Sequence, residues 1–441
     1  MSNYSSQIQN LISRYAKEEK PIEVDFRELV SDLRSPERAT HLIHSYPAKL
    51  LAHIPFFFLN NNYLTEKGAT ILDPFSGSGT VLLESILADK NCYGADSNPL
   101  AELISRVKTT VYNIDQLKRC FTDLQKSYNS TEKHCPTPDV ININYWFTEK
   151  VVIELNKIRR VILLIDDDDL RGFFLVTFSS IVKKVSLADP RVSVPVRLKK
   201  NKYKNKNKEL NDRVNQQLKR IENIDVWHKF SEEVQKNIKR FKSFSDLNNN
   251  DCSLVDFYSD ARDLQCGRES VDMIITSPPY AGAQKYIRSS GLNIGWLEMP
   301  QSNKLMNLKR NSIGREDYRK EDYMQLTKTE IDNADEHLER IYSKNKIRAH
   351  IAANYLLEMK DALKRSVHTL KNEGYFVLVI ANNHICGEKF ETQKYLQVII
   401  EELGLSLKFK LIDNIKSYGL MTKRNKTANI ITREYVMLFQ K

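Results

Sequence analysis

Ser277, Pro278, Pro279 and Tyr280 form a run whose residue types could bind and activate a planar amine. Two successive prolines fix two φ angles, so the carbonyls of Ser277 and Pro278 point outward instead of closing local turns. The Tyr280 ring can stack on a heteroaromatic base, while the Ser277 hydroxyl and the Pro278 carbonyl accept hydrogen bonds from the amino group. These bonds draw the nitrogen toward sp³ geometry and localise its lone pair for in-line attack on a methyl group. Alone, the same residues are equally typical of a turn that ends a strand.

A second chemical signal is the glycine-rich segment 73–80, which lies between an apolar strand and a periodic helix. Gly77 and Gly79 let the backbone approach a ligand, and the helix N-terminus offers unpaired N–H groups, which suits a dinucleotide or an adenosyl cofactor. Leu82 stands where a dinucleotide fingerprint needs a third glycine, and the Gly-Lys-Ser/Thr of a phosphate-binding loop is absent. Asp96 ends the next strand, where an acid can accept both ribose hydroxyls. The alternative is a glycine-rich turn followed by a solvated acid.

The elements that must position these loops form a split α/β pattern. The expected strands are 69–73, 92–96, one near Val255, 271–275, 375–380, 405–412 and 435–439, and the expected helices among them are 80–88, 99–107, 347–370 and 393–403. Alternating strands and helices at this spacing predict a parallel sheet, whose carboxyl edge binds ligands. Residues 113–250 have helical apolar spacing and no comparable strand, so they are expected to form an all-helical insertion.

Composition favours a polyanionic partner, because the 441 residues carry a net charge of +11. Between Arg197 and Arg220 the sequence has ten Lys and Arg residues but only two acidic residues. The Lys- and Asn-rich stretch at 198–211 is expected to be mobile in the free protein. No apolar run reaches membrane-spanning length and no secretory signal is present, so we expect a cytoplasmic protein. The six scattered cysteines predict free thiols and no metal site.

Several motifs in order resemble those of the DNA amino-methyltransferases, the N4-cytosine and N6-adenine group, which use S-adenosylmethionine. DPFSGSGT (73–80) is similar to their cofactor loop, GADSNPLA (94–101) to their ribose-binding strand end, and TSPPY (276–280) to their catalytic loop. YSDA (258–261) resembles the segment whose acid meets the cofactor adenine, and HSYPAK (44–49) resembles the motif that closes the methionine side. The cofactor-binding residues that the resemblance implies are Tyr46, Pro47, Lys49, Asp73, Pro74, Phe75, Gly77, Gly79, Thr80, Asp96, Ser97, Asp260, Ala261 and Thr276.

The resemblance implies a Rossmann-like class I methyltransferase sheet with an antiparallel last strand. Residues 1–112 would hold a mostly helical N-terminal segment and the first half of the cofactor-binding domain, and residues 113–250 the insertion. Residues 251–441 would hold the second half with the catalytic loop. The bases could be read by the insertion or by residues 281–345, and the sequence does not choose between them.

Ser277, where the adenine enzymes of the group mostly have an acid or amide, favours N4 of cytosine as the acceptor, with N6 of adenine as the alternative. A cytosine-C5 enzyme is disfavoured because no Pro-Cys nucleophile is present. The target base must be flipped out of duplex DNA, and Tyr280 is the candidate to stack on it. Phosphate contacts are expected from Lys199, Lys200, Lys202 and Lys204, with a solvated linker between helices as the alternative. Arg288, in the segment 281–345, is a candidate contact to the bases of DNA. Arg288 could instead pair with Glu298.

The family habit implies a modification enzyme whose cognate restriction endonuclease acts separately. Two other functions stay open. One is methylation of an RNA base, and the other is a catalytically silent DNA-binding protein, which would predict broken motifs. We expect no membrane partner.

Overall fold

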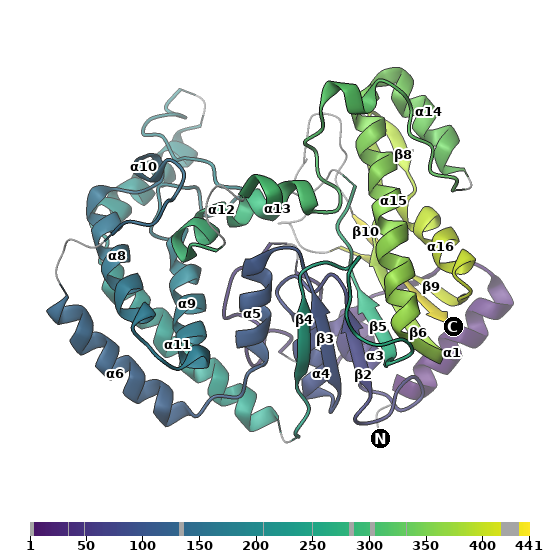
Figure 1. Ribbon diagram of the computed structural model, residues 1–441, viewed down its shortest axis with the longest axis horizontal. Helices are drawn as coiled ribbons and strands as arrows, with labels where there is room; N and C mark the ends of the chain where they lie inside the picture. The colour runs from purple at the N-terminus through teal and green to yellow at the C-terminus, as the bar shows by residue number, and fades with distance from the viewer. Residues whose placement is uncertain are drawn as a thin grey trace.

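A mixed eight-stranded sheet forms the centre of the computed structural model (Figure 1), with strand order β1-β9-β10-β6-β5-β2-β3-β4. The structure describes residues 4–33, 35–47, 49–131, 136–205, 207–248, 250–281, 286–299, 305–331, 333–415 and 432–441. The strands are β1 (Ile22–Val24), β2 (Thr70–Asp73), β3 (Asn91–Ala95), β4 (Leu254–Tyr258), β5 (Val271–Thr276), β6 (Leu370–Ile380), β9 (Ser406–Asn414) and β10 (Arg433–Gln440). Only β10 runs antiparallel to its neighbours. The predicted Rossmann-like fold with an antiparallel last strand is confirmed.

Both faces of the sheet are covered, so alternate residues of the central strands enter two different cores. In β6, Val377 and Val379 belong to the core of one face, while Phe376 and Leu378 belong to the core of the other. The first core is covered by α4 (Thr80–Leu87) and α5 (Pro99–Thr109), and the second by α15 (Lys346–Thr369) and α16 (Thr392–Glu402). These four helices match the predicted ones.

The N-terminal segment is less helical than predicted. It contains α1 (Tyr4–Glu18), α2 (Phe26–Leu29) and α3 (His53–Leu59), but β1 lies between α1 and α2 and joins the edge of the sheet. β1 pairs in parallel with β9, with Ile22 opposite Leu411. A strand of three residues is too short to show a period, and its partner lies far along the chain, so local pattern could not reveal it.

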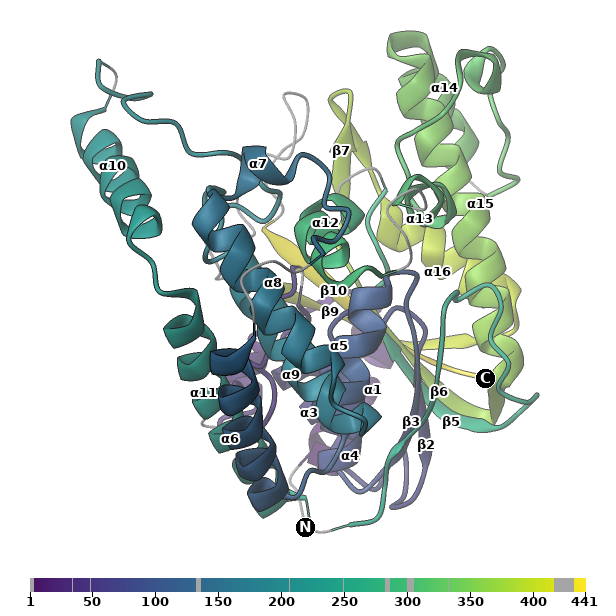
Figure 2. The same cartoon turned by 60° about the vertical axis from the view of Figure 1, so that its left-hand side comes forward.

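The insertion is helical, as predicted, and has no named strand among its described residues. Its helices are α6 (Ile114–Ser130), α7 (Ile143–Trp146), α8 (Glu149–Leu163), α9 (Asp168–Val182), α10 (Lys208–Glu222) and α11 (Val226–Leu247). Thr148 caps α8 and Asp167 caps α9 through their side chains. The expected mobile stretch is wrong for its last residues, because α10 begins at Lys208. Figure 2 shows α8, α9 and α11 packed beside the sheet domain, with α10 extending from them.

Between the catalytic loop and α15 lie elements that the sequence pattern did not reveal. They are α12 (Tyr286–Leu297), α13 (Leu305–Asn311), the 3₁₀ helix η2 (Lys320–Tyr323) and α14 (Ala334–Lys344), and a hairpin of β7 (Asn383–Ile385) and β8 (Glu388–Phe390) follows β6. In the described parts of the chain, no helix combines the length and apolarity needed to cross a bilayer. The cysteines of those parts are free thiols, as predicted.

A buried ionic cluster joins the N-terminal segment to α4. Both oxygens of Glu84, whose side chain is fully buried, accept from the Arg38 guanidinium at 2.8 Å, and one also contacts His41 Nε2 at 2.7 Å. Burial lowers the pKa of His41 to about 4, so the ring is neutral at pH 7 and donates to the carboxylate. Arg38 therefore supplies the charge that balances Glu84.

Replacing Arg38 with Met should lower the free energy of unfolding by about 3–5 kcal/mol, because it leaves a buried carboxylate without its counter-charge. Urea unfolding followed by circular dichroism measures the loss. The matched control is Arg14→Met, which breaks the exposed Arg14–Glu18 pair and should cost less than about 1 kcal/mol. Equal losses in the two variants would contradict a structural role for the cluster.

Candidate active site

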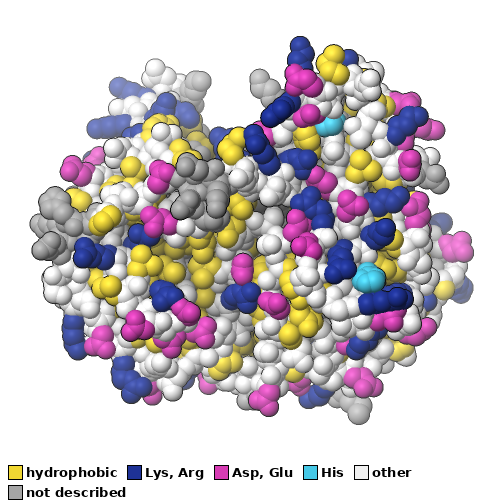
Figure 3. Space-filling view, viewed as in Figure 1, with side chains coloured by type: hydrophobic (Ala, Val, Ile, Leu, Met, Phe, Trp, Pro, Cys, Tyr) yellow, Lys and Arg dark blue, Asp and Glu magenta, His cyan; other side chains and the backbone are white. Residues whose placement is uncertain are grey.

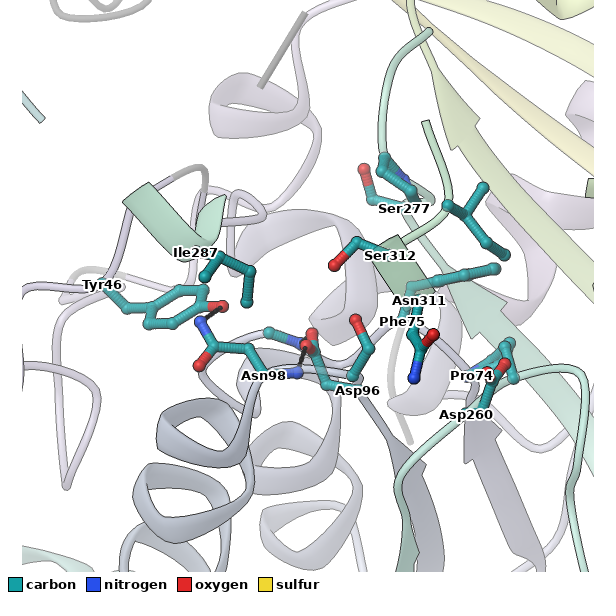
Figure 4. Close-up of a pocket in the computed structure, with 15 residues that line it drawn as sticks. Tyr46, Pro74, Phe75, Asp96, Asn98, Asp260, Ser277, Ile287, Asn311 and Ser312 are labelled. Carbon is teal, nitrogen blue, oxygen red and sulfur yellow. Dashed lines mark hydrogen bonds between the residues drawn. The ribbon is translucent and has the colours of Figure 1, made fainter. Parts of the chain in front are cut away.

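One open pocket lies at the carboxyl edge of β2, β3 and β5 and receives residues from both halves of the split domain. Its open space, with the solvent at its mouth included, is about 690 Å³. Its lining residues are Tyr46, Pro74, Phe75, Gly77, Asp96, Ser97, Asn98, Asp260, Ala261, Ser277, Pro279, Ile287, Asn311, Ser312 and Ile313. In Figure 4, Asp260 lies toward one end, Tyr46 and Asn98 lie toward the other, and Asp96 lies between them. The pocket thus unites the two loops that the sequence analysis singled out.

The glycine-rich loop bends closely around neighbouring side chains. Gly77 has φ +51°, and a Cβ there would lie 3.5 Å from the Tyr46 ring. Gly79 has φ +71° and precedes α4, and a Cβ there would meet Ser105 Oγ at 2.8 Å. Both positions favour glycine because the positive φ would strain a side chain, and at Gly79 a side chain would also be crowded by Ser105.

Asp96 lies at the middle of the pocket with its carboxylate fixed by the backbone. Its Oδ2 accepts from Gly77 N at 3.0 Å and its Oδ1 accepts from Asn98 N at 2.8 Å. Burial raises the pKa of Asp96 to about 6, although both backbone bonds favour the ionised form. Each carboxylate oxygen can accept further hydrogen bonds, so a diol in the pocket could be bound by both oxygens.

Asp260 lies at the end of the pocket opposite Tyr46 (Figure 4). Its carboxylate is held by Arg262, which the sequence analysis missed. Arg262 Nη2 contacts Asp260 Oδ2 at 2.6 Å and donates to the carbonyl of Asn311 at 2.7 Å. Glu358, on α15, bonds to Arg315 and lies 3.9 Å from Arg262 Nη1. These bonds fix Asp260 and the segment 311–313 around the same end of the pocket.

Thr276, the first residue of the TSPPY loop, bonds directly to the glycine-rich loop. Its hydroxyl donates to Asp73 Oδ1 at 2.7 Å, and the same oxygen accepts from Phe75 N at 3.1 Å. Burial raises the pKa of Asp73 to about 7, while the Thr276 bond favours ionisation. Neither side chain lines the pocket. Both instead fix the loops that do, which places Ser277 at the pocket wall.

Tyr280 lies outside the pocket lining, as does Pro278. Its hydroxyl contacts Glu434 Oε1 on β10 at 3.2 Å, and its ring packs against Ala381 and Ile415. The structure therefore places Tyr280 behind Ser277, on the side of β10 rather than on the side of Asp96.

Asn98, which sequence reasoning also missed, joins three segments at the pocket. Its side-chain amide donates to Tyr46 Oη at 3.0 Å and to Ser290 Oγ on α12 at 3.1 Å, while its Oδ1 caps α5. One turn further along α12, Asn293 donates to the Ser179 carbonyl on α9 at 2.7 Å. Two buried polar contacts thus anchor α12, which carries Ile287 into the pocket.

The remaining predicted residues lie beside the pocket. Lys49 donates to the His41 carbonyl at 2.7 Å, Pro47 is half-buried next to Tyr46, and Thr80 is buried at the start of α4. Arg288 is exposed on α12. The alternative pairing of Arg288 with Glu298 is wrong in that Glu298 bonds to Arg159 on α8.

The four lysines predicted to bind DNA lie away from the pocket, in the segment that precedes α10, and their side chains are exposed. Among the described residues, no group of three His, Cys, Asp or Glu side chains could hold a metal ion. The arrangement can therefore bind an elongated ligand with a diol near Asp96, and it presents a hydroxyl, Ser277, at its wall.

Comparison with known proteins agrees with this geometry, although no protein-family model matches the chain. The chain is similar to the Type II methyltransferase M.MvaI of Kocuria varians, with 24% identity over 411 residues, which cover 89% of this chain and 87% of that protein. It is also 35% identical over 100 residues to the Type II methyltransferase M.MjaII of Methanocaldococcus jannaschii, covering 22% of this chain and 18% of that protein. Similarity over most of the M.MvaI chain, together with the sheet order, supports a Rossmann-like methyltransferase fold.

Proposed function

We propose that this protein is an S-adenosylmethionine-dependent DNA methyltransferase of a restriction–modification system, and that it methylates an exocyclic amine, with N4 of cytosine as the favoured acceptor. One observation carries the proposal: Asp96, Asp260 and Ser277 line the same pocket. Asp96 is the acid at the strand end where a ribose would bind, and Ser277 belongs to the TSPPY loop. The similarity to two proteins named Type II methyltransferases supports the same reaction class.

The residues of the pocket fit the cofactor in chemistry and in order. Asp96 would accept the ribose hydroxyls, Asp260 would meet the adenine amino group, and Tyr46 would close the methionine side. Phe75 and Ile313, both in the lining, offer apolar surface for the adenine ring. The loop around Gly77 has no side chain that would fill the space against Tyr46.

The cofactor would supply an electrophilic methyl group. Ser277 Oγ and the Pro278 carbonyl would accept hydrogen bonds from the amino group of the target base and orient its lone pair toward that methyl group. Transfer would move the methyl group in line from the sulfur to this nitrogen, and the methylated nitrogen would then release a proton to water. No side chain has to act as a strong base.

Duplex DNA is the proposed substrate, because the basic insertion and the exposed Lys199, Lys200, Lys202 and Lys204 suit phosphates. The target base must leave the stack to reach Ser277. Tyr280 would then have to reorient in order to stack on it, since its hydroxyl contacts Glu434. A cognate restriction endonuclease acting separately completes the proposed system.

Replacing Ser277 with Ala should lower the rate of methyl transfer to duplex DNA about 100-fold, because it removes one of two acceptors that position the amine. Transfer of labelled methyl groups to plasmid DNA, followed by nucleoside digestion and mass spectrometry, measures both rate and product. N4-methylcytosine is the expected product. N6-methyladenine would overturn the base assignment but keep the mechanism, and transfer only to RNA would overturn the DNA substrate.

Cofactor affinity should weaken as the pH falls below about 6, because protonated Asp96 can no longer accept both ribose hydroxyls. One proton predicts about a tenfold loss per pH unit. Calorimetric titration of the full chain with S-adenosylhomocysteine between pH 5 and 8 measures it. Asp96→Asn should bind more weakly at pH 8 and lose this pH-dependent step. Wild-type affinity of Asp96→Asn at pH 8 would refute the role of Asp96.

A further inference from the structure

The end of the insertion that follows α9 lies on the same side of the molecule as the pocket. At one end of α9, Gly172 packs against Val107, near the last residue of α5. At the other end of α9, the Ser179 carbonyl accepts from Asn293 on α12. One turn earlier on α12, Ser290 accepts from Asn98, the N-cap residue of α5. α9 is therefore antiparallel to α5, and its C-terminus reaches the carboxyl edge of the sheet. Figures 1 and 2 both place α10 and α12 at this end.

The first segment after α9 is a loop closed by backbone contacts, here called the hairpin loop (residues 188–197). Ala188 and Arg197 form an antiparallel bridge, and Asp189 N donates to the Val196 carbonyl at 2.8 Å. The ammonium of Lys183 donates to the carbonyls of Val192 and Ser193 at its tip. Burial lowers the pKa of Lys183, and the nearby Asp189 carboxylate opposes this shift.

The hairpin loop exposes two apolar side chains, and a guanidinium lies at its base. Val192 is 39% exposed and Val196 is 48% exposed. Arg197 lies over the ring of Tyr145 on α7, with its Cζ 4.5 Å from the ring centroid. Single exposed valines are ordinary, but here two lie in one loop that Arg197 closes at the pocket end of the insertion. Methyl groups that can contact thymine and a guanidinium that can contact guanine are the side-chain types that read base edges.

The next segment, here called the lysine loop (residues 199–205), is held by asparagines. Asn201 and Asn215 on α10 bond reciprocally, with Asn201 N donating at 3.2 Å to Asn215 Oδ1 and Asn215 Nδ2 donating at 3.1 Å to Asn201 Oδ1. Tyr203 N donates to Asn211 Oδ1 at 3.3 Å. The Asn content that predicts mobility therefore serves to attach the loop to α10.

The lysines of this loop carry uncompensated charge. The side chains of Lys199, Lys200, Lys202 and Lys204 are exposed, and none forms an ion pair with any residue that the structure describes. By contrast, several cations of residues 305–345 are paired with acids: Arg315 with Glu358, and Arg340 and Lys344 with Glu388. Figure 3 shows a notch between the two lobes with Lys and Arg side chains on both sides.

We propose that the hairpin loop and the lysine loop together form the surface that binds duplex DNA, with the lysine loop contacting phosphates and the hairpin loop contacting base edges. This inference rests on the proposed function and assigns target reading to the insertion. The partner is recognised by two features at once: a polyanionic backbone for the lysines, and groove edges with methyl and acceptor groups for Val192, Val196 and Arg197.

The phosphate contacts are tested by the salt dependence of duplex binding by the full chain. Each phosphate contact adds about 0.9 to the slope of log affinity against log salt, so changing the four lysines to Gln should reduce the slope by about 3–4. The control changes four exposed lysines elsewhere to Gln: Lys20, Lys236, Lys239 and Lys242. Its slope should equal the wild-type slope. Equal slopes in the two variants would overturn the lysine loop assignment.

The base contacts are tested by mapping methylated sites in plasmid DNA by sequencing. Val192→Ser with Val196→Ser should reduce discrimination between the preferred site and its single-base variants about tenfold, with an unchanged salt slope. The control is Val111→Ser with Val255→Ser, two valines that are 60% and 51% exposed on other surfaces. Wild-type discrimination by the hairpin variant would overturn the reading role.

An error in the surface assignment and an error in the proposed function give different experimental results. If the wild-type chain methylates duplex DNA but neither loop variant differs from its control, only the surface assignment is wrong. If the wild-type chain binds single-stranded RNA and no duplex DNA, the proposed function and this inference are both wrong. The salt-dependence assay measures binding without methyl transfer, so a catalytic defect cannot imitate the loss of a phosphate contact.

Discussion

The buried hydrogen bond from Thr276 to Asp73 is the contact on which the organisation of the site depends. It joins the ends of β2 and β5, which are adjacent because the two strands pair in parallel. Along the chain, the same two ends are separated by the whole insertion. Because the bond lies at the point where both loops leave the sheet, it fixes the cofactor loop relative to the catalytic loop. A reaction between two bound groups needs such a fixed relation, since small displacements cost large factors in rate.

The other segments around the pocket are joined to this pair of loops by further buried polar contacts. Asn98 connects Tyr46 and α12 to the middle of the pocket, and Arg262 connects the last residue of α13 to Asp260. The insertion enters the same arrangement through Ser179, which Asn293 contacts from α12. The loops of the insertion that we propose to bind DNA are therefore connected through α9 and α12 to the walls of the pocket.

The sequence predicted what depends on local pattern: the principal strands of the sheet, the helices between them, and the two loops whose residue types are unusual. It did not reveal β1, whose three residues form a strand only because β9 supplies an edge. It also could not reveal that Arg262 braces Asp260 or that Asn201 pairs with Asn215, because such contacts depend on packing rather than on period. Tyr280 was predicted from its type to face the base, yet its position also depends on Glu434, which lies far along the chain.

The central claim is that the Thr276 hydroxyl positions the catalytic loop against the cofactor loop. The most direct measurement compares single-turnover methyl transfer by Thr276→Val and Thr276→Ser, with S-adenosylhomocysteine affinity measured in parallel. The valine variant should lose about tenfold or more in rate while keeping its fold and cofactor affinity, and the serine variant, which retains the donor, should stay near wild type. Equal rates for the two variants would contradict the account.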